Sequence, residues 1–400
     1  MNILVINCGS SSLKFQLIES ATEAVLGKGL CERIGINGSK ITHQVGKQKW
    51  EKEVPFPTHT EAFMEVVDQM TAGEGAVIKS KDEIDAIGHR VVQGAEWFTK
   101  SEIVTDAIID KIEEIAPLAP VHNLAHVQGL RSAKKVFGAD MPNVVVFDTT
   151  FHQTMPPKAY MYGIPYKFYE ENKIRRYGAH GTSHRYVSMK AAEFLGKPAS
   201  ELKIVTCHLG NGSSITAVDG GKCVDTSMGL TPLAGVLMGT RCGDIDPSVV
   251  TYMEQITGMH GQEMADYLNK KSGLLGVSGI SSDKRDIENA MLEGNERAKL
   301  ASDMLNYQIK KFVGAYTAAM GGLDCIVFTG GIGENDKIVR QEVCADMEFF
   351  GLSIDPALND RKGRDIVDIT GPNSKVKVLI ICTNEELMIA RDTMALVKKD

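Results

Sequence analysis

Three short loops rich in glycine and small polar residues are the clearest chemical features of the sequence. They read "NCGSSS" (7–12), "HLGNGSS" (208–214) and "TGGIGEN" (329–335), and each follows an apolar run. Glycine lets backbone N–H groups approach a ligand closely, and successive N–H groups form an anion-binding concavity to which Ser and Asn side chains add donors. Lys14, just after the first loop, adds a positive charge. The loops therefore predict phosphate binding.

The standard nucleotide-binding motifs are absent from the chain. No G-x-x-x-x-G-K-[ST] segment occurs, which excludes the Walker-type NTPases. The "GGIGEN" segment lacks the G-x-G-x-x-G spacing of a dinucleotide fingerprint, so a Rossmann dehydrogenase is the weakest of the readings considered. The phosphate site must belong to another fold.

Single charged residues stand where predicted strands end, and five of them are candidates for chemistry. They are Arg90 in "IGHRVVQG", Asp148 in "VVVFDTTF", His180 in "YGAHGTSH", Arg241 in "MGTRCGDIDP" and Glu385 in "TNEELMIAR". Ligands of open α/β sheets gather at the carboxyl ends of strands. Each residue also has a structural alternative: an ion pair for the arginines, a turn cap for the aspartate, a hydrogen-bonded loop for the histidine, and a favourable first-turn helix position for the glutamate. The pattern alone leaves both readings open.

The elements that must position these residues alternate between strands and helices, which predicts an α/β fold. Apolar runs predict strands at Ile3–Ile6, Ala86–Gly88, Val144–Phe147, Ile204–Cys207, Ile326–Thr329 and Val376–Cys382. Apolar residues at three- and four-residue spacing predict helices over Ile108–Ile115, after Thr105 as cap, and over about Ala298–Ala319.

The chain also carries an internal repeat. With Gly9 placed over Gly210, Asn7 falls on His208 and Ser12 on Ser213, and apolar strands flank both turns. A strand–turn–strand unit at matching places in two halves predicts a duplicated fold. We expect one domain over 1–150 plus 385–400 and a second over 151–384.

Composition restricts the function classes. The chain has 400 residues, 43% of them hydrophobic, and a net charge of −7, so bulk charge gives no support for nucleic-acid binding. No apolar run suggests a membrane span, the start shows no leader pattern, and the eight cysteines form no C-x-x-C. We therefore expect a cytoplasmic protein with reduced cysteines.

Two phosphate hairpins in duplicated halves, with a later strand–GGxGxN–helix, resemble the actin, hexokinase and sugar-kinase superfamily, in which ATP lies in a cleft between two related domains. Longer segments resemble the acetate kinase family across the whole chain. These segments are "NCGSSSLKF", "GHRVVQG", "DTTFHQTMP", "YGAHGTSHRYV", "HLGNGSS", "DTSMGLTPLAGVLMGTRCGDIDP", "FTGGIGEN" and "TNEELMIAR". The resemblance implies two actin-like (ribonuclease H-like) α/β domains, a homodimer, and reversible Mg²⁺-dependent (alternatively Mn²⁺-dependent) phosphoryl transfer from ATP to acetate, giving ADP and acetyl phosphate.

The resemblance also implies roles for individual residues. It assigns the metal to Asn7 and Glu385, the substrate carboxylate to Arg90 with Val92 and Pro232 beside it, acid/base work to Asp148, and the transition state to His180 and Arg241. It assigns ATP and its phosphates to Ser10, Ser12, Lys14, His208, Leu209, Gly210, Asn211, Gly212, Asp283, Lys284, Arg285, Gly331, Ile332, Gly333, Glu334 and Asn335. The first domain would hold the carboxylate and the second the nucleotide.

Physical chemistry supports most of these roles but not the one implied for Asp148. Arginines suit a reaction in which a carboxylate meets a phosphate, because guanidinium stays charged and binds planar oxyanions with two donors. A small carboxylic acid, with a pKa of roughly 4, is already ionised at neutral pH. The nucleophile therefore needs no general base, and we expect Asp148 to orient magnesium-bound water or an arginine instead.

Two alternatives remain open on the sequence. A propionate-preferring kinase is one, since the residues expected near the carboxylate, Val92, Val121, Ala179 and Pro232, are small or medium in size. An actin-like ATPase that acts by shape change, without a carboxylate substrate, is the other. Arg90, His180 and Arg241 argue against it, because a filament or chaperone module needs no second anion site.

Overall fold

The computed structural model describes residues 1–361 and 365–398, with the side chains of residues 120 and 121, hence that of Val121, outside the description. The chain forms two compact units, Met1–Thr150 with Asn384–Asp400, and Phe151–Thr383. Residues 399 and 400, at the end of the expected first domain, lie outside the described residues. Asn384, expected in the second domain, groups with the first unit, because its side chain accepts a hydrogen bond from the N–H of Leu387 and caps the final helix.

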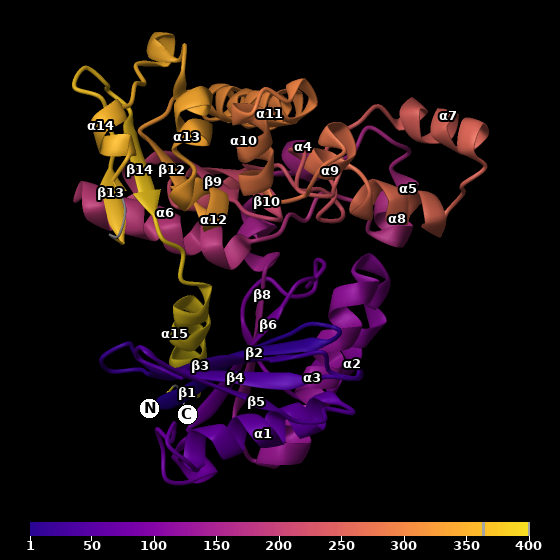
Figure 1. Ribbon diagram of the computed structural model, residues 1–400, viewed down its shortest axis with the longest axis vertical. Coiled ribbons are helices and arrows are strands. Elements are labelled where there is room, and N and C mark those ends of the chain that lie inside the picture. Colours follow the sequence, from indigo (N-terminus) through magenta and orange to yellow (C-terminus); the bar gives the residue numbers. More distant parts are fainter. Residues whose placement is uncertain (362–364, 399–400) are drawn as a thin grey trace. The chain divides into compact units, whose positions relative to one another are not determined.

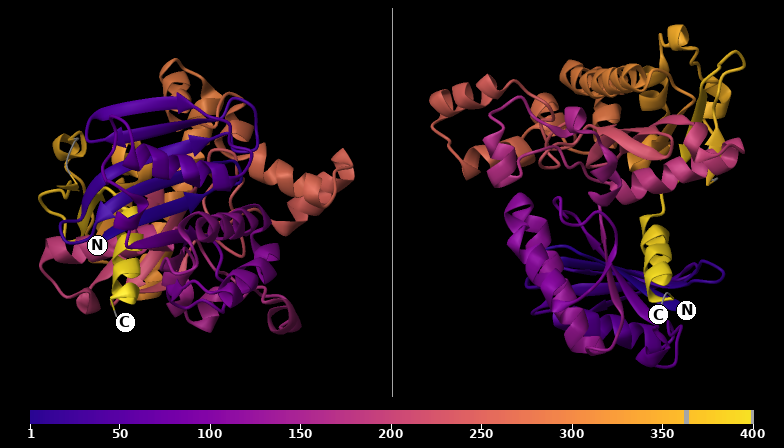
Figure 2. Two further views of the ribbon diagram at one scale, coloured as in Figure 1. Left: turned by 90° about the horizontal axis from the view of Figure 1, so that it is seen from below. Right: turned by 180° about the vertical axis from the view of Figure 1, so that it is seen from behind.

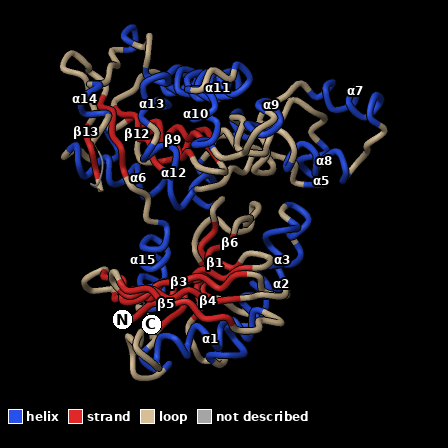
Figure 3. Tube along the Cα trace, viewed as in Figure 1, coloured by secondary structure: helices blue, strands red, loops and turns tan. Residues whose placement is uncertain are grey.

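The first unit is built on one mixed sheet (Figures 1 and 3). Its strands are β1 Asn2–Cys8, β2 Ser12–Glu19, β3 Ala24–Glu32, β4 Lys40–Val45, β5 Gln48–Glu53, β6 Ala86–Val91, β7 Glu102–Ile103 and β8 Asn143–Phe147. The sheet order is β5-β4-β3-β2-β1-β6-β8-β7. Strands β1 to β5 form an antiparallel meander, while β1, β6 and β8 run parallel.

Helices cover both faces of this sheet. They are α1 His59–Thr71, α2 Asp106–Glu114, α3 Pro120–Phe137 and α15 Glu385–Val397, with short 3₁₀ turns at Lys81–Glu83 and Ala116–Leu118. Alternate residues of β1 point to opposite faces: Leu4 and Ile6 pack in the core with α1 and α3, whereas Ile3 and Val5 pack in the core with α15. Figure 2 shows α15, the yellow C-terminal helix, alongside the strands of this unit.

The second unit contains a second mixed sheet. Its strands are β9 Lys203–Leu209, β10 Ser213–Asp219, β11 Lys222–Thr226, β12 Cys325–Thr329, β13 Ile366–Asp368 and β14 Lys377–Ile381, in the order β11-β10-β9-β12-β14-β13. Its helices are α4 Pro157–Tyr160, α5 Lys167–Asn172, α6 Gly181–Leu195, α7 Pro247–Thr257, α8 Gln262–Lys270, α9 Gly273–Ser278, α10 Lys284–Leu292, α11 Glu296–Met320, α12 Gly330–Asn335, α13 Lys337–Cys344 and α14 Pro356–Asn359, with 3₁₀ turns at Thr150–Thr154, Ala199–Glu201 and Glu348–Phe350. Residues of α11 pack on one face of the sheet and those of α6 on the other.

The predicted duplication is confirmed by the two sheets. The order β3-β2-β1-β6-β8 in the first unit matches β11-β10-β9-β12-β14 in the second, with the same strand directions. The ungapped alignment of Ser12 with Ser213 is wrong by one residue. Cys8 pairs with Leu13 in the first hairpin, but Leu209 pairs with Ser213 in the second. The second turn is thus one residue shorter, and Ser213 takes the place of Leu13.

The predicted elements are present. Each of the six predicted strands overlaps an observed one, and α2 begins after Thr105, whose side chain accepts from the N–H of Ile108. None of the eight cysteines forms a disulfide, and six of them are buried. Among the described helices, none combines the length and the apolar content that a membrane crossing requires.

Candidate active site

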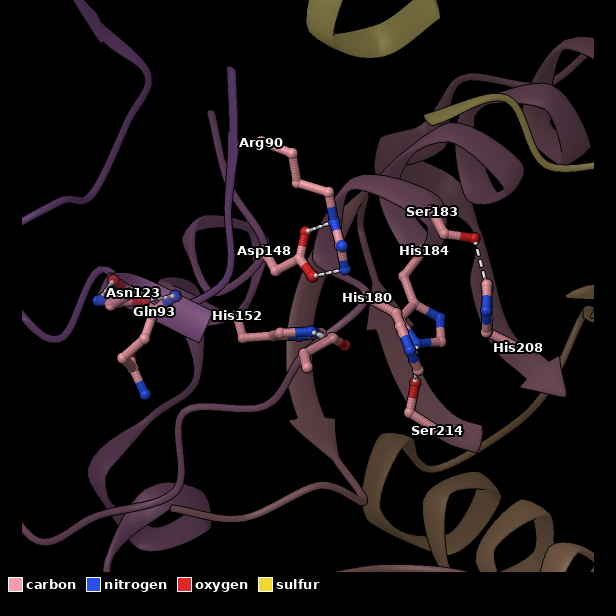
Figure 4. Close-up of polar contacts among 11 residues, drawn as sticks. Arg90, Gln93, Asn123, Asp148, His152, His180, Ser183, His184, His208 and Ser214 are labelled. Carbon is pink, nitrogen blue, oxygen red and sulfur yellow. Dashed lines mark hydrogen bonds and ion pairs between the residues drawn. The ribbon is translucent and has the colours of Figure 1, made fainter. Parts of the chain in front are cut away.

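A buried ion pair stands at the carboxyl ends of two neighbouring strands of the first unit. Arg90 lies near the end of β6, and Asp148 directly follows β8 (Figure 4). The guanidinium donates from Nε to Oδ1 at 3.1 Å and from Nη2 to Oδ2 at 2.5 Å. The Asp148 side chain is only 1% exposed, and its N–H donates to the carbonyl of Val91 at 2.9 Å. The pKa of Arg90 is raised: burial opposes the charge, but the carboxylates of Asp148 and Glu385 outweigh burial.

A carboxyl group without a hydrogen-bond partner lies beside this pair. Glu385, in the first turn of α15, lines a small cavity together with Asn7 and Arg90. Its Oε1 is buried and has no hydrogen-bond partner within the described part of the chain. Burial raises the pKa of Glu385 to about 7; the charge of Arg90 lowers it, and that of Asp148 raises it further.

These residues fit the metal site that was predicted from the resemblance. Asn7 offers an amide oxygen and Glu385 a buried carboxylate oxygen that needs a positive partner. Mg²⁺ binds oxygen ligands and usually takes only one or two from the protein, keeping several waters. The donor set therefore suits Mg²⁺ better than the nitrogen and sulfur ligands that zinc prefers.

The first glycine loop is fixed by backbone and histidine contacts. The N–H of Gly9 donates to the carbonyl of Ser12 at 2.8 Å, and the imidazole Nε2 of His59 bonds the Gly9 carbonyl at 2.8 Å. Ser10 is exposed and Ser12 half-buried. Lys14 forms an ion pair with Glu386 of α15. Sequence reasoning missed His59, because nothing near it in the chain points to the loop.

The second unit contains a pocket of about 650 Å³ at the predicted nucleotide residues, a volume typical of small-molecule sites. Eight predicted residues line it: Gly210, Asn211, Asp283, Lys284, Arg285, Gly331, Ile332 and Asn335. Five lining residues were not predicted: Gly239, Leu274, Ser282, Glu288 and Asp336. The lining does not include the other five residues predicted in the second unit, His208, Leu209, Gly212, Gly333 and Glu334, or the three predicted in the first unit, Ser10, Ser12 and Lys14.

Close packing explains how the two glycine loops of the second unit meet. Gly330 has φ +76°, and a Cβ there would lie 2.6 Å from the carbonyl oxygen of Leu209. By contrast, a Cβ on Gly331 would meet nothing within 4 Å. Only part of the loop is therefore open to a ligand.

Within the pocket, the ammonium of Lys284 lies 3.0 Å from the carboxylate of Asp336, and both side chains are buried.

Glu334 supports the loop from behind. Its carboxylate accepts from the N–H of Gly330 at 2.9 Å and from the N–H of Thr383 at 3.2 Å. Arg340, buried on α13, donates from Nη1 to the carbonyl of Gly333 at 2.8 Å and from Nε to Asn359 at 2.7 Å. The Glu334 carboxylate is thus already occupied by backbone N–H groups, which competes with its predicted role in binding ATP. Arg340 is a supporting residue that no motif indicated.

His180 and Arg241 face the same point of the second glycine loop. A Cβ built on Gly212 would lie 3.4 Å from Nε2 of His180 and 3.4 Å from Nη1 of Arg241. His180 caps α6 in the left-handed conformation, with φ +59°, and its ring stacks on that of His208 with centroids 4.2 Å apart. Arg241 donates from Nη1 to the carbonyl of Pro232 at 3.2 Å, and burial lowers its pKa. The side chains of His180 and Arg241 thus face one point of the second glycine loop.

The predicted residues therefore fall into two groups. Asn7, Arg90, Asp148 and Glu385 come together in the first unit, where Val92 is buried as well. His180, Arg241 and the nucleotide pocket belong to the second unit. The duplicated sheet with a glycine loop at matching strand ends in each half defines the class, an actin-like kinase fold of two related α/β units.

Comparisons with known proteins specify the family. The model of the acetokinase family matches residues 2–391. The chain is 54% identical over 402 residues to the acetate kinase of Thermotoga maritima, covering 100% of this chain and 99% of that protein. It superimposes on the crystal structure of Porphyromonas gingivalis acetate kinase with a TM-score of 0.95 at 46% identity, covering 99% of both chains. It superimposes on a propionate kinase from Francisella tularensis with a TM-score of 0.90 at 41% identity, covering 98% of both. The chain belongs to the acetokinase family.

The first prediction concerns Gly212→Ala. The added methyl group meets its neighbours at ordinary van der Waals distance and φ needs no glycine, so we expect the thermal unfolding midpoint to stay nearly unchanged. The methyl group fills the space that His180 and Arg241 face, so we expect phosphoryl-transfer activity to fall about 100-fold. Gly163→Ala, whose Cβ meets nothing within 4 Å, is the matched control. Full activity of Gly212→Ala would show that this space is not used.

The second prediction concerns the pH dependence of stability. The pKa of Glu385 is raised in the folded protein, so its stabilising contribution is complete below about pH 4.5 and is lost as the pH rises through about 7. In the absence of divalent cations, Glu385→Gln should lack this loss, which amounts to at most about 3 kcal/mol.

Thermal unfolding of both proteins between about pH 4 and pH 8, with EDTA, measures the difference. Glu23→Gln is the control. Glu23 forms an ion pair with Arg391, which lies on α15 as Glu385 does, but the Glu23 side chain is exposed. Parallel pH profiles for the wild type and Glu385→Gln would contradict the assignment of a buried, titrating carboxyl group.

Proposed function

We propose that this protein transfers the γ-phosphoryl group of ATP to acetate, reversibly and by direct in-line transfer, forming ADP and acetyl phosphate. Membership of the acetokinase family over the whole chain carries this proposal. The arrangement of charge supports it, because an ATPase without an anionic acceptor has no use for an arginine held at strand ends in the unit that lacks the nucleotide pocket.

In the proposed reaction the first unit holds the acceptor. The acetate carboxylate is ionised at neutral pH and attacks phosphorus without a general base. Asp148 engages Nε and Nη2 of Arg90, which leaves Nη1 as the donor that the described contacts do not use. Arg90 binds the carboxylate through this donor and orients it, which is the main contribution a protein makes to phosphoryl transfer.

The second unit holds the donor. ATP occupies the pocket between the glycine loops and α10, with its terminal phosphate toward Gly212. His180 and Arg241 donate hydrogen bonds to the phosphoryl oxygens as the group transfers. Asn7 and Glu385 hold Mg²⁺, or Mn²⁺ as an alternative, which when bound neutralises phosphate charge. Ser10, Ser12 and Lys14 add donors at the first loop, although the ion pair between Lys14 and Glu386 competes with a phosphate.

The residues that were predicted to lie near the carboxylate are compatible with acetate as the preferred substrate and with propionate as a weaker one. Val92 and Ala179 are small and buried, and Pro232 is half-buried. One methylene group in an apolar pocket changes the free energy of binding by only about 1–3 kcal/mol. We therefore propose that the enzyme prefers acetate and also accepts propionate.

We propose that the protein works in the cytoplasm as a homodimer. Eight cysteines that form no disulfide, six of them buried, suit a reducing compartment. None of the residues of α7 is buried, and Val249, Tyr252 and Ile256 expose an apolar face on it, as interaction surfaces do. Light scattering that gives the mass of one chain would contradict the dimer.

The experiment that tests the function measures ADP release from Mg-ATP with acetate, propionate, butyrate or no acid, and traps the acyl phosphate with hydroxylamine. We expect turnover that depends on the acid, with acetate having the highest kcat/KM and propionate about 10- to 200-fold lower. ADP release that needs no acid, without trapped product, would instead identify an ATPase that acts by shape change. A higher kcat/KM for propionate would assign a propionate kinase.

A further prediction concerns Asp148. Asp148→Asn replaces one of the two carboxylate oxygens that hold the Arg90 guanidinium with an NH₂ group, which donates instead of accepting, so we expect kcat to fall about 100-fold or more and the KM for acetate to rise. The loss should be uniform between about pH 6 and pH 8, because no proton transfer is involved. Asp140→Asn, at an exposed turn before β8, is the control. Normal turnover of Asp148→Asn at saturating Mg²⁺ would rule out the positioning role, and a strongly pH-dependent loss would favour acid/base work.

A further inference from the structure

A chain of short hydrogen bonds connects His180 to the interior of the second unit (Figure 4 shows its outer part). Nδ1 of His180 lies 2.9 Å from Oγ of Ser214, which lies 2.7 Å from Nε2 of His184. Nδ1 of His184 in turn lies 2.7 Å from Oγ1 of Thr206. Ser214, His184 and Thr206 are completely buried, so water does not substitute for these contacts.

Such a chain has a direction. A hydroxyl group carries one hydrogen and a neutral imidazole carries one N–H. If Thr206 donates to His184, then His184 donates to Ser214 and Ser214 donates to Nδ1 of His180, which leaves the proton of His180 on Nε2. If the chain runs the other way, Nδ1 of His180 carries the proton and the neutral ring presents a lone pair at Nε2.

We infer that the chain runs outward from Thr206, so that Ser214 and His184 are positioning residues that keep the proton of neutral His180 on Nε2. This inference rests on the proposed function, in which His180 donates to a phosphoryl oxygen. Its consequence is that His180 remains a donor at Nε2 whether or not the ring is charged. Phosphoryl transfer then needs no imidazolium.

The inner end of the chain favours this direction. In the described part of the chain, the hydroxyl of Thr206 also lies 3.4 Å from the carbonyl of Thr216, a distance near the limit for a hydrogen bond in which Thr206 would be the donor. Its single hydrogen therefore belongs to the 2.7 Å contact with His184. His184 itself stays neutral, because burial lowers its pKa, with the charges of His152 and His208 adding to the effect.

The outer end favours the same direction. The Cε1–Nε2 edge of His180 faces Gly212, and Arg241 faces the same point. A bound phosphoryl oxygen there accepts hydrogen bonds and repels a lone pair. The ring of His208 stacks against that of His180, and the positive end of α6 begins directly after His180. The neutral ring with its proton on Nε2 is thus the form that suits the site.

Ser214→Ala tests the inference. The substitution removes one buried oxygen and adds no volume, and it leaves Nδ1 of His180 without its donor. Neutral His180 then divides between its two tautomers, and only the imidazolium is always a donor at Nε2. Across the ordinary range of histidine titration, we expect kcat of Ser214→Ala to fall about twofold as the pH rises from about 6 to about 8, because only about half of the neutral rings then carry the proton on Nε2, with the KM for ATP and for acetate unchanged. The wild type should show no such fall.

Two matched variants complete the kinetic test. Ser188→Ala removes a different buried serine hydroxyl, which lies on α6 and donates to the carbonyl of Arg185. Ser188 is not part of the hydrogen-bond chain, so this variant should behave as the wild type. Thr206→Val removes the inner donor with almost no change in shape and should reproduce the pH profile of Ser214→Ala in weaker form. A flat profile for Ser214→Ala, or the same fall in the wild type, would overturn the inference.

The tautomer can also be observed without turnover. In ¹⁵N-histidine-labelled protein with bound ADP, NMR should show His180 of the wild type protonated at Nε2, and a mixture in Ser214→Ala. A wild-type His180 protonated at Nδ1 would overturn the inference even if the enzyme is active. If the wild type makes no acyl phosphate, the proposed function fails, and the NMR result still decides the direction of the chain.

Discussion

The buried pair of Arg90 and Asp148 is the interaction on which the chemistry of the first unit depends. Burying a carboxylate costs several kcal/mol unless a positive group and hydrogen bonds compensate it. Arg90 provides both, with two donors on Asp148, and the N–H of Asp148 continues the β6–β8 ladder. The same contacts hold the guanidinium in one orientation. A pair of this kind adds little net stability, so its value lies in fixing where the remaining donor of Arg90 points.

The second unit obeys the same constraint with different partners. Polar groups behind its phosphate loops are buried and therefore must find one another. Glu334 accepts hydrogen bonds from the N–H groups of Gly330 and Thr383, and Arg340 donates one to the carbonyl of Gly333. Ser214 joins the imidazoles of His180 and His184. These residues position the loop and the histidine because their own hydrogen bonds leave them few alternatives.

Local patterns in the sequence were enough to predict the framework. The central strands are continuous apolar runs because helices cover both faces of each sheet, and the glycine loops follow directly from them. The candidate site residues could be singled out because they interrupt apolar runs at strand ends, as Arg90 and Asp148 do.

The supporting residues could not be found in the same way. His59 reaches Gly9 across 50 positions of the chain, and Arg340 looks like an ordinary helix residue until it is seen buried. In the β3–β5 meander, β5 is mostly exposed and polar, β4 alternates between buried and half-buried residues, and two glycines interrupt β3, so no continuous apolar run marked it. The one-residue gap in the repeat was missed because serines follow the glycine in both hairpins, and only the strand register shows which serine corresponds to Leu13.

Duplication followed by divergence explains how one architecture carries two chemically different sets of side chains. Asn7 and His208 occupy equivalent positions of the two hairpins, where the first pairs with Lys14 and the second with Ser214. Around Asn7 the first unit gathers the carboxyl groups of Asp148 and Glu385, a set of oxygens that suits a hard cation. Around His208 the second unit gathers imidazoles and the guanidinium of Arg241, which suit phosphate oxygens. Because both sets stand at the same strand ends of the same fold, the two units differ here in their side chains and in the length of the hairpin turn, which is one residue shorter in the second unit.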